Sequence, residues 1–309
     1  MIADQNPIIR SGLRGALFSI GFRNISETSS FTKLNDLILQ DAIDLLITSS
    51  ELEGNDTGFL VSEMRNHRLG HNPFLVVITL LANAEPDYVK RVIDSGADDL
   101  LLMPVQPDQL ILRIEKLTRA RKPFVVTHDY TGPDRRTKAR AFETHSAPML
   151  EVPNPVKFRT ENPGMDGTRL IRMVAESATT LNRMKIERYA VQIDWLVAHI
   201  HASIRDGAVA DPAELAPHTA KLVKVAEDMA ERMRGTGAEK FIEPVTDVLG
   251  LAHTLDAAPG QVPFAVLERL TELSRTISRT LVTTTPARAP CAPAAVCAPA
   301  APPRVAVVT

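Results

Sequence analysis

The sequence predicts an α/β fold with a doubly wound parallel sheet of five strands, followed by an all-α helical bundle and a disordered tail. Two observations predict this order. Up to residue 121, short and nearly continuous apolar runs alternate with amphipathic stretches, which is typical of strands buried on both faces by helices. From residue 168, long stretches repeat apolar residues with helical spacing, and no strand-like run intervenes.

Three strands of the first domain, residues 1–121, are clear from their apolar runs. They are residues 43–48 (IDLLIT), 74–79 (FLVVIT) and 98–102 (DDLLL). Helical spacing fills the segments around them, and proline stands in the first turn of three of these segments, where its missing N–H costs nothing. The predicted helices are residues 7–21, 31–40, 57–67, 86–95 and 107–119.

The residue composition and spacing change after the first domain. Residues 122–167 contain six prolines, so we expect a Pro-rich linker or extension with some ordered contacts. Residues 168–283 are predicted to form the bundle. Its helices are expected at residues 168–203, 212–234, 241–255 and 264–281, with Trp195 in its core. Residues 284–309 are nearly all Pro, Ala, Val and Thr, and a disordered tail is expected there.

Composition excludes several classes of function. The formal net charge of -2 gives no global field toward nucleic acid or an anionic membrane, so neither is expected as a partner. Both cysteines lie in the tail, which fits a cytoplasmic protein without disulfides. No apolar run approaches the roughly 18 residues of a membrane span. Because no Gly-rich phosphate loop, nucleophile elbow or zinc pair occurs, we expect no enzyme, metal or cofactor.

The opening segment, residues 2–13 (IADQNPIIRSGL), resembles the start of response-regulator receiver (CheY-like) domains, where a strand ends in an acidic pair. The resemblance continues through residues 44–58, at Thr79, and through residues 95–104 (SGADDLLLMP), in the family's order. It implies transfer of a phosphoryl group to an Asp at a strand end. A divalent cation held by the acidic pair and a Lys beside the phosphoryl oxygens assist this step.

The acidic pair and the acceptor depart from that pattern. Asp4 is followed by Gln5, whose neutral amide oxygen is a poorer ligand for Mg²⁺. Depending on a one-residue gap, either Ser49 or Ser50 occupies the acceptor position, and neither is a carboxylate. Only three residues precede Asp4, so the first strand is abbreviated or the true start lies upstream.

The other side of the pocket is altered too. Met103 stands in place of the Lys before the proline, and only the hydroxyl of Thr79 is retained. Asp56 is an alternative acceptor if the motif is misaligned, but it follows the strand by several residues. Glu51 is aimed away from the pocket if Ser50 lies in it. We therefore expect a degenerate, catalytically silent pocket.

Beyond the first domain, residues 130–136 (YTGPDRR) are similar to a segment that follows receivers in some alphaproteobacterial regulators. A basic cluster there could bind phosphate or a nucleotide, or simply be a solvated linker. Its members are Arg135, Arg136, Lys138 and Arg140. Arg136 and Arg140 have the RxxxR spacing of the PilZ domain, but that family's second motif is absent.

In the helical part, residues 249–256 (LGLAHTLD) resemble the phospho-accepting helix of histidine phosphotransfer domains, with His253 as the candidate acceptor. The Lys and Gly that follow in that family are replaced by Asp256 and Ala257. Because Asp256 would repel an arriving phosphoryl group, a degenerate or unrelated bundle is the alternative. His199 and His201 face different directions on their helix and are not expected to share a metal.

These features support one leading hypothesis and two alternatives. The leading one is a pseudo-receiver: a non-catalytic signalling protein of the phosphorelay type that binds a histidine kinase, receiver or phosphotransfer protein. The contact is expected on the face formed by residues 86–95, 98–102 and 107–119, and a homodimer through this face is left open. The alternatives are a working phosphorelay carrier at His253 and a transcription regulator, for which no helix-turn-helix pattern is found.

Overall fold

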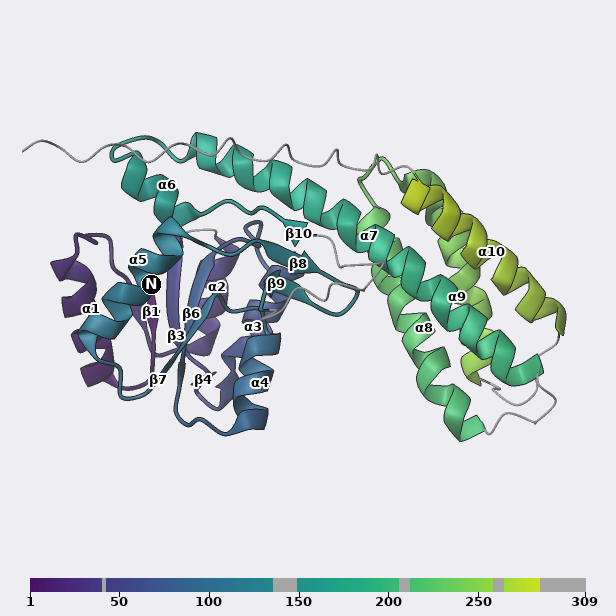
Figure 1. Ribbon diagram of the computed structural model, residues 1–309, viewed down its shortest axis with the longest axis horizontal. Coiled ribbons are helices and arrows are strands. Elements are labelled where there is room, and N and C mark those ends of the chain that lie inside the picture. The colour runs from purple at the N-terminus through teal and green to yellow at the C-terminus, as the bar shows by residue number, and fades with distance from the viewer. Residues whose placement is uncertain (41–42, 136–148, 206–211, 258–263, 284–309) are drawn as a thin grey trace, which may run out of the picture.

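A computed structural model describes residues 1–40, 43–135, 149–205, 212–257 and 264–283. The expected tail at residues 284–309 lies outside the described residues. An α/β domain and a helical bundle stand side by side, and one long helix runs along both of them (Figure 1).

The α/β domain is built on a parallel sheet with strand order β2-β1-β3-β6-β7. All four strand pairs of this sheet are parallel, which confirms the doubly wound fold expected from the alternating pattern. The strands are β1 (Ile2–Ala3), β2 (Glu27–Thr28), β3 (Leu45–Ser49), β6 (Val76–Leu81) and β7 (Asp99–Leu102). A small hairpin of β4 (Glu51–Leu52) and β5 (Asn55–Asp56) follows β3.

The helices of this domain begin where the sequence signals them. Asn6, Ser30 and Asp56 cap three of the helices through side-chain oxygens that accept backbone N–H groups. Proline starts the other two. The helices are α1 (Pro7–Ser19), α2 (Phe31–Leu39), α3 (Thr57–Arg65), α4 (Pro86–Asp94) and α5 (Pro107–Arg119). Helices α1 and α5 cover one face of the sheet, and α2 and α3 cover the other.

The segment expected to be a linker is more ordered than predicted. Its described residues form a second, antiparallel sheet with order β10-β8-β9 and a short helix. These elements are β8 (Phe124–Val126), β9 (Thr131–Pro133), β10 (Met149–Leu150) and α6 (Pro155–Glu161). The prolines misled the prediction because Pro133 lies on an edge strand and Pro155 at the first position of a helix, two places where proline costs little.

Glycine lets this second sheet approach the first domain. Gly96 follows α4 with a φ of +90°, and a Cβ there would lie 2.6 Å from the carbonyl oxygen of Thr131 in β9. Any other residue would be strained and would push β9 away. Gly96, in the SGADD segment that carries part of the family resemblance, is therefore needed for the extension to dock.

The sequence pattern assigns the whole of helix α7 (Thr168–Arg205) to the bundle. In the structure, the helix extends beyond the bundle. Its first half packs with the extension: Leu170, Val174 and Leu181 share a core cluster with Phe124 and Phe158. Only from Ile186 onward do its residues enter the bundle core. The boundary between the two bodies therefore falls inside α7 and not at residue 168.

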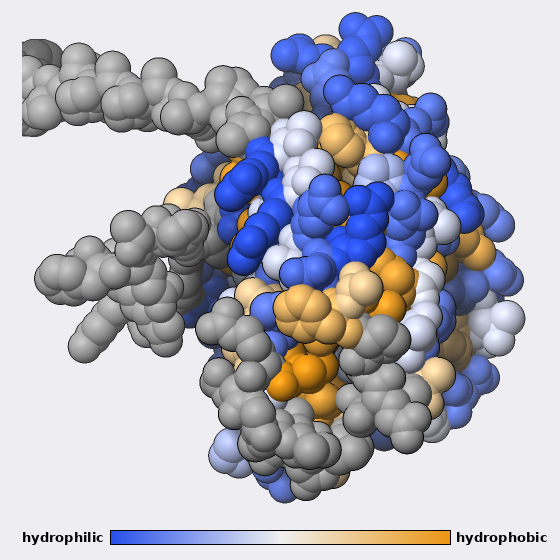
Figure 2. Space-filling model, turned by 90° about the vertical axis from the view of Figure 1, so that its right-hand side faces the viewer, coloured by the Kyte–Doolittle hydropathy of each residue, from blue (hydrophilic) through white to orange (hydrophobic). Residues whose placement is uncertain are grey.

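The bundle packs the second half of α7 against three further helices, as the spacing predicts. They are α8 (Pro212–Met233), α9 (Ile242–Ala257) and α10 (Phe264–Thr283), with a short 3₁₀ turn at Glu239–Phe241. Leu196 and Ile200 lie in its core, but Trp195 is 54% exposed and stacks on His199. Seen from its end, the bundle shows a group of apolar side chains with polar ones above it (Figure 2). Within the described residues, no helix is long and apolar enough to cross a membrane.

Candidate functional site

The predicted pocket lies at the carboxyl edge of the parallel sheet, where β1 and β3 end next to each other. Ala3 pairs with Thr48, so the next residues, Asp4 and Ser49, lie side by side. The Ser49 hydroxyl donates to the carbonyl oxygen of Glu51 at 2.7 Å and lies 3.5 Å from that of Ala3. The register of the two strands thus places Asp4 and Ser49 next to each other at this edge.

Asp4 is the carboxylate that this edge retains from the expected pair. Burial raises its pKa, while the Asn6 backbone N–H, 2.7 Å from Oδ1, and the Arg10 guanidinium act in the opposite direction. Arg10 donates to the backbone carbonyl oxygens of Asp4 and Gln5, at 2.7 and 3.1 Å. The Gln5 side chain is exposed. Among the described residues, no group of three or more His, Cys, Asp or Glu side chains is placed to hold a metal ion.

Ser50, the alternative acceptor position, is occupied by a contact that the sequence did not reveal. Its hydroxyl forms a short hydrogen bond with the Tyr88 hydroxyl from the first turn of α4. The backbone here is fixed as well, because Thr57 donates its hydroxyl to the Ser49 carbonyl oxygen at 2.6 Å and its N–H to that of Ser50 at 3.1 Å. Nothing in a sequence of this kind indicates that a tyrosine 38 residues away reaches Ser50.

Thr79 and Met103 lie apart from this pair. Thr79 is fully buried and pairs with Thr48 inside the sheet, two residues before β6 ends at Leu81. Its hydroxyl is therefore placed below the sheet edge. Met103 precedes a cis proline and packs against the apolar cluster under α1 and α5. It supplies no charge where the family resemblance implies a Lys.

The two other carboxylates considered near the acceptor have different places. Asp56 is exposed, belongs to the β4–β5 hairpin and caps α3 by accepting the Gly58 N–H at 2.8 Å. Glu51 pairs with Asp56 in that hairpin and is also exposed. Both carboxylates therefore lie outside the sheet edge formed by Asp4 and Ser49.

The basic cluster after the first domain is only partly described. Arg135 is half-buried and donates to the carbonyl oxygen of Ala97, so it anchors the extension to the receiver-like domain. Arg136, Lys138 and Arg140 lie outside the described residues.

His253 has a surface position on α9. Its side chain is 56% exposed, and Nε2 lies 3.9 Å from a carboxylate oxygen of Glu227 on α8. Asp256 accepts a hydrogen bond from the Thr219 hydroxyl at 2.7 Å. The imidazole is thus accessible, as a carrier requires, but its charged neighbours are carboxylates.

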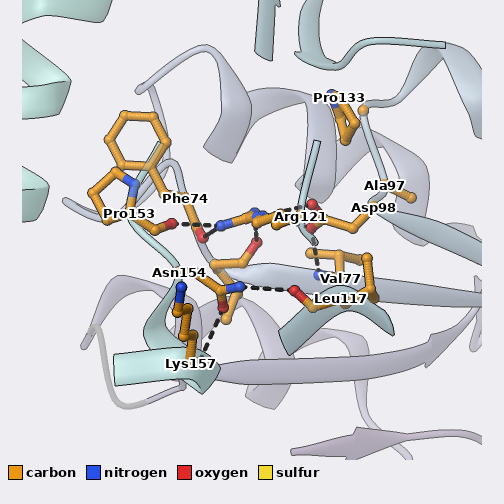
Figure 3. A network of polar contacts seen from close by, with 12 residues as sticks. Phe74, Val77, Ala97, Asp98, Leu117, Arg121, Pro133, Pro153, Asn154 and Lys157 are labelled. Carbon is orange, nitrogen blue, oxygen red and sulfur yellow. Dashed lines mark hydrogen bonds and ion pairs between the residues drawn. The ribbon is translucent and has the colours of Figure 1, made fainter. Parts of the chain in front are cut away.

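A buried polar network around Asp98 was missed at the sequence level (Figure 3). Asp98, buried beside the sheet, accepts hydrogen bonds from Arg65 at 2.8 Å and from Arg121 at 2.8 and 3.0 Å. The N–H of Val77 also donates to it at 2.9 Å. Burial alone would raise the pKa of Asp98, but Arg121 and Arg65 hold it below its usual range.

Of the two guanidinium groups of this network, that of Arg121 bonds the extension to the first domain, and that of Arg65 packs against the Phe124 ring of the extension. Arg65 donates to the carbonyl oxygens of Pro73 and Leu75, both at 2.7 Å. Arg121 donates to that of Pro153 at 2.7 Å (Figure 3). Burial lowers the pKa of Arg65 to about 10, and Asp98 opposes that shift, so Arg65 stays charged at neutral pH. The network therefore has a structural role.

Comparisons with known proteins concern mainly the first domain. Residues 1–115 match the family model of the response regulator receiver domain. The chain is similar to the alginate biosynthesis transcriptional regulatory proteins AlgB of Pseudomonas syringae pv. tomato and Pseudomonas putida, each 26% identical over 153 residues. These matches cover 49% of this chain and 32% of each relative, so the chain spans about a third of the length of the curated relatives it matches.

Solved structures similar to this chain include receiver domains. The signal receiver domain of NarL from Mycobacterium tuberculosis is 22% identical with a TM-score of 0.35, covering 39% of this chain and 94% of that structure. The isolated receiver domain of RcsB from Salmonella enterica serovar Typhimurium is 26% identical with a TM-score of 0.34, covering 39% of this chain and 88% of that structure.

Proposed function

Because residues 1–115 are a response-regulator receiver domain of two-component systems, we propose that the chain is a non-catalytic signalling protein that works by protein–protein contact. The observation that carries this proposal is the sheet edge itself. Ser49 stands beside Asp4 where an acceptor carboxylate is needed, and the Ser50 hydroxyl is engaged by Tyr88. A serine hydroxyl cannot form the acyl phosphate that a carboxylate nucleophile forms.

The charges around the edge support the same proposal. A divalent cation prefers several hard oxygen ligands, and Asp4 offers one carboxylate that burial makes harder to ionise. The negative charge that develops in phosphoryl transfer needs a fixed cation near the transferred group. Met103 cannot supply it, and the nearby Arg10 is directed to backbone carbonyl oxygens.

The first prediction is that the purified protein takes up no phosphoryl group from acetyl phosphate with Mg²⁺. Phosphate-affinity gel electrophoresis and intact mass would show no added phosphoryl group under conditions that label an active receiver. Hydroxylamine-sensitive, Mg²⁺-dependent label on residues 44–58 would contradict the proposal, since such sensitivity is the property of an acyl phosphate.

The proposed contact surface is formed by α4, β7 and α5. Strand β7 is an edge of the main sheet, and two large apolar side chains stand out on this face. Leu102 is 48% exposed and Leu112 is 63% exposed. The same two elements, β7 and α5, also carry an ion pair of 3.3 Å between Asp99 and Arg113. An apolar centre with a charged rim is the usual composition of a protein interface.

We expect Leu112→Glu to weaken binding to a cognate signalling protein at least tenfold, since a buried apolar contact becomes a desolvated charge. Isothermal titration with the purified partner would measure this. Leu39→Glu is the matched control, because Leu39 is similarly exposed but lies on α2, away from the proposed surface. Equal loss in both variants, or in neither, would contradict this surface. Sedimentation of the protein alone tests whether the partner is a second copy.

The alternative of a phosphorelay carrier is favoured by one observation, the exposure of His253. We expect no transfer to it from a phosphorylated cognate receiver, because Glu227 and Asp256 place negative charge around the imidazole. Transfer would be measured by acid-labile, alkali-stable label, with His253→Ala as the blank. Label on the wild type that Asp256→Lys increases would decide in favour of the carrier.

The alternative of a transcription regulator rests on the names of the curated relatives, which are transcriptional regulatory proteins. The net charge of -2 does not favour DNA, so binding would have to come from a local basic patch. A salt-dependent gel shift with duplex DNA would support this alternative.

A further inference from the structure

The junction between the receiver and the bundle contains a buried amino group without a partner. Lys185, in the middle of α7, is 1% exposed. Among the described residues, its Nζ has no hydrogen-bond partner, and it lies 6.0 Å from the centre of the Tyr189 ring. A charged amine in such a place loses its hydration and gains no hydrogen bond in return.

Other cations crowd the same place. The Arg232 guanidinium of α8 lies 5.8 Å from the same Tyr189 ring and, like Arg188 one turn along α7, leaves its Nε without a partner in the described part of the chain. His128, in the turn between β8 and β9, has a buried Nε2 without a hydrogen bond in the described part of the chain, 3.6 Å from a carboxylate oxygen of Asp129. The chain therefore gathers buried side-chain nitrogen atoms here from three separate elements.

The carboxylates that face Lys185 do not neutralise this group. Asp228 of α8 is bound to Arg68 at 2.7 Å, and Arg68 also contacts Glu63 at 3.4 Å. Asp129 in the turn is 70% exposed and is shared with His128 at 3.6 Å and with the Thr127 hydroxyl at 2.7 Å, so it offsets the charge of Lys185 only in part. Lys221 of α8 faces the same turn and adds a further positive charge.

These residues also hold the two bodies together. Arg232 donates to the carbonyl oxygen of Asn66, just after α3 of the receiver, and to Asn182 of α7 at 3.3 Å. The ion pair of Arg68 with Asp228 joins the same two bodies. Lys185 thus lies behind the contacts through which the bundle docks on the receiver.

We propose that this junction is a proton-linked contact, in which packing of α8 and the β8–β9 turn against α7 favours the uncharged form of Lys185. Opening the junction would expose the amine to water, where it takes up a proton. The docked arrangement is therefore favoured as the solution becomes more alkaline, and the proton is released to solvent on docking.

The direction of this pH dependence, and the pH range over which it acts, follow from the pKa of Lys185 in the docked and open states. Burial, with Arg232 beside it, lowers the pKa of Lys185 to about 7 from the ordinary 10.5. Between these values the open state holds one more proton than the docked state. The equilibrium constant for docking therefore rises by up to tenfold per pH unit, and by about 50-fold in all from pH 7 to pH 9. Below pH 7 both states are protonated, and the dependence disappears.

The test is hydrogen exchange followed by mass spectrometry on the full chain at pH 6 to 9, corrected for intrinsic exchange rates. In the wild type, protection of peptides covering residues 127–131 and 225–233 should rise about 50-fold from pH 7 to pH 9, as calculated for one proton. Lys185→Met should be well protected already at pH 7 and change less than threefold. Lys224→Met removes an exposed lysine of α8 and should behave as the wild type.

The ¹³Cε resonance of Lys185, assigned by its loss in the variant, measures the amine directly. A midpoint near 10, or the same pH response in the wild type and Lys185→Met, would overturn the proposal. Should Lys185→Met fail to fold, Asp129→Asn tests the same idea, because removing this carboxylate further disfavours the charged amine. Its response should then begin at a lower pH, and an unchanged response would count against the proposal.

Discussion

Asp98→Ala is expected to lower the free energy of unfolding by about 3–5 kcal/mol, the cost of removing one partner of a buried ion pair. The substitution leaves two buried guanidinium groups, Arg65 and Arg121, close to each other without a counter-charge. It also removes the acceptor of the Val77 N–H inside the sheet. Urea denaturation followed by circular dichroism would measure the loss.

The neighbouring residue provides the control for this prediction. Asp99→Ala removes a partly exposed pair with Arg113 and should cost less than about 1 kcal/mol. Because the pKa of Asp98 is lowered, its contribution is present above the ordinary Asp pKa and disappears as the pH falls through the folded value. Asp98→Asn should therefore flatten the acid side of the stability profile. Equal losses for the two alanine variants would show that the network contributes little.

Phe124→Ala is expected to cost about 3–5 kcal/mol as well, the range for removing a buried aromatic side chain. Phe124 is fully buried, and its ring lies 5.0 Å from the Arg65 guanidinium and 5.1 Å from that of Arg121. It also contacts the Phe74 ring at 6.0 Å between centroids. Its loss should loosen the extension and the first half of α7 together.

Thermal unfolding of Phe124→Ala would measure this effect, with limited proteolysis to locate it. Phe59→Ala is the control, since Phe59 is exposed on α3 and its removal should change stability by less than about 1 kcal/mol. Cleavage in the wild-type pattern, with an unchanged midpoint, would mean that the extension does not depend on this ring.

The core of the receiver could be predicted because its strands are buried on both faces and its helices carry clear start signals. Runs such as residues 74–79 leave little choice of structure. The extension could not be predicted, because strands as short as Met149–Leu150 contain too few residues for any periodicity. The first half of α7 has the same spacing as a bundle helix, and periodicity does not say which body a helix covers.

The residues of the site likewise fall into those that could be predicted from the sequence and those that could not. The expectation that serine replaces the acceptor and Met103 the Lys comes from the sequence, because neighbours along the chain mark these positions. Tyr88 reaching Ser50, and Arg65 inserting under Phe124, depend on distant segments. A charged residue is normally expected on the surface, so burial of Arg65 and Lys185 carried no sequence signal.

Helix α7 is one continuous rod that connects the two bodies. Its 38 residues make a rod about 57 Å long, with one end fixed in the cluster around Phe124 and the other in the bundle core. On a rod of that length, a tilt of about 5° at the receiver end displaces the far end by about 5 Å. A partner that shifts the receiver's packing only slightly would thus move the bundle surface by the width of a side chain.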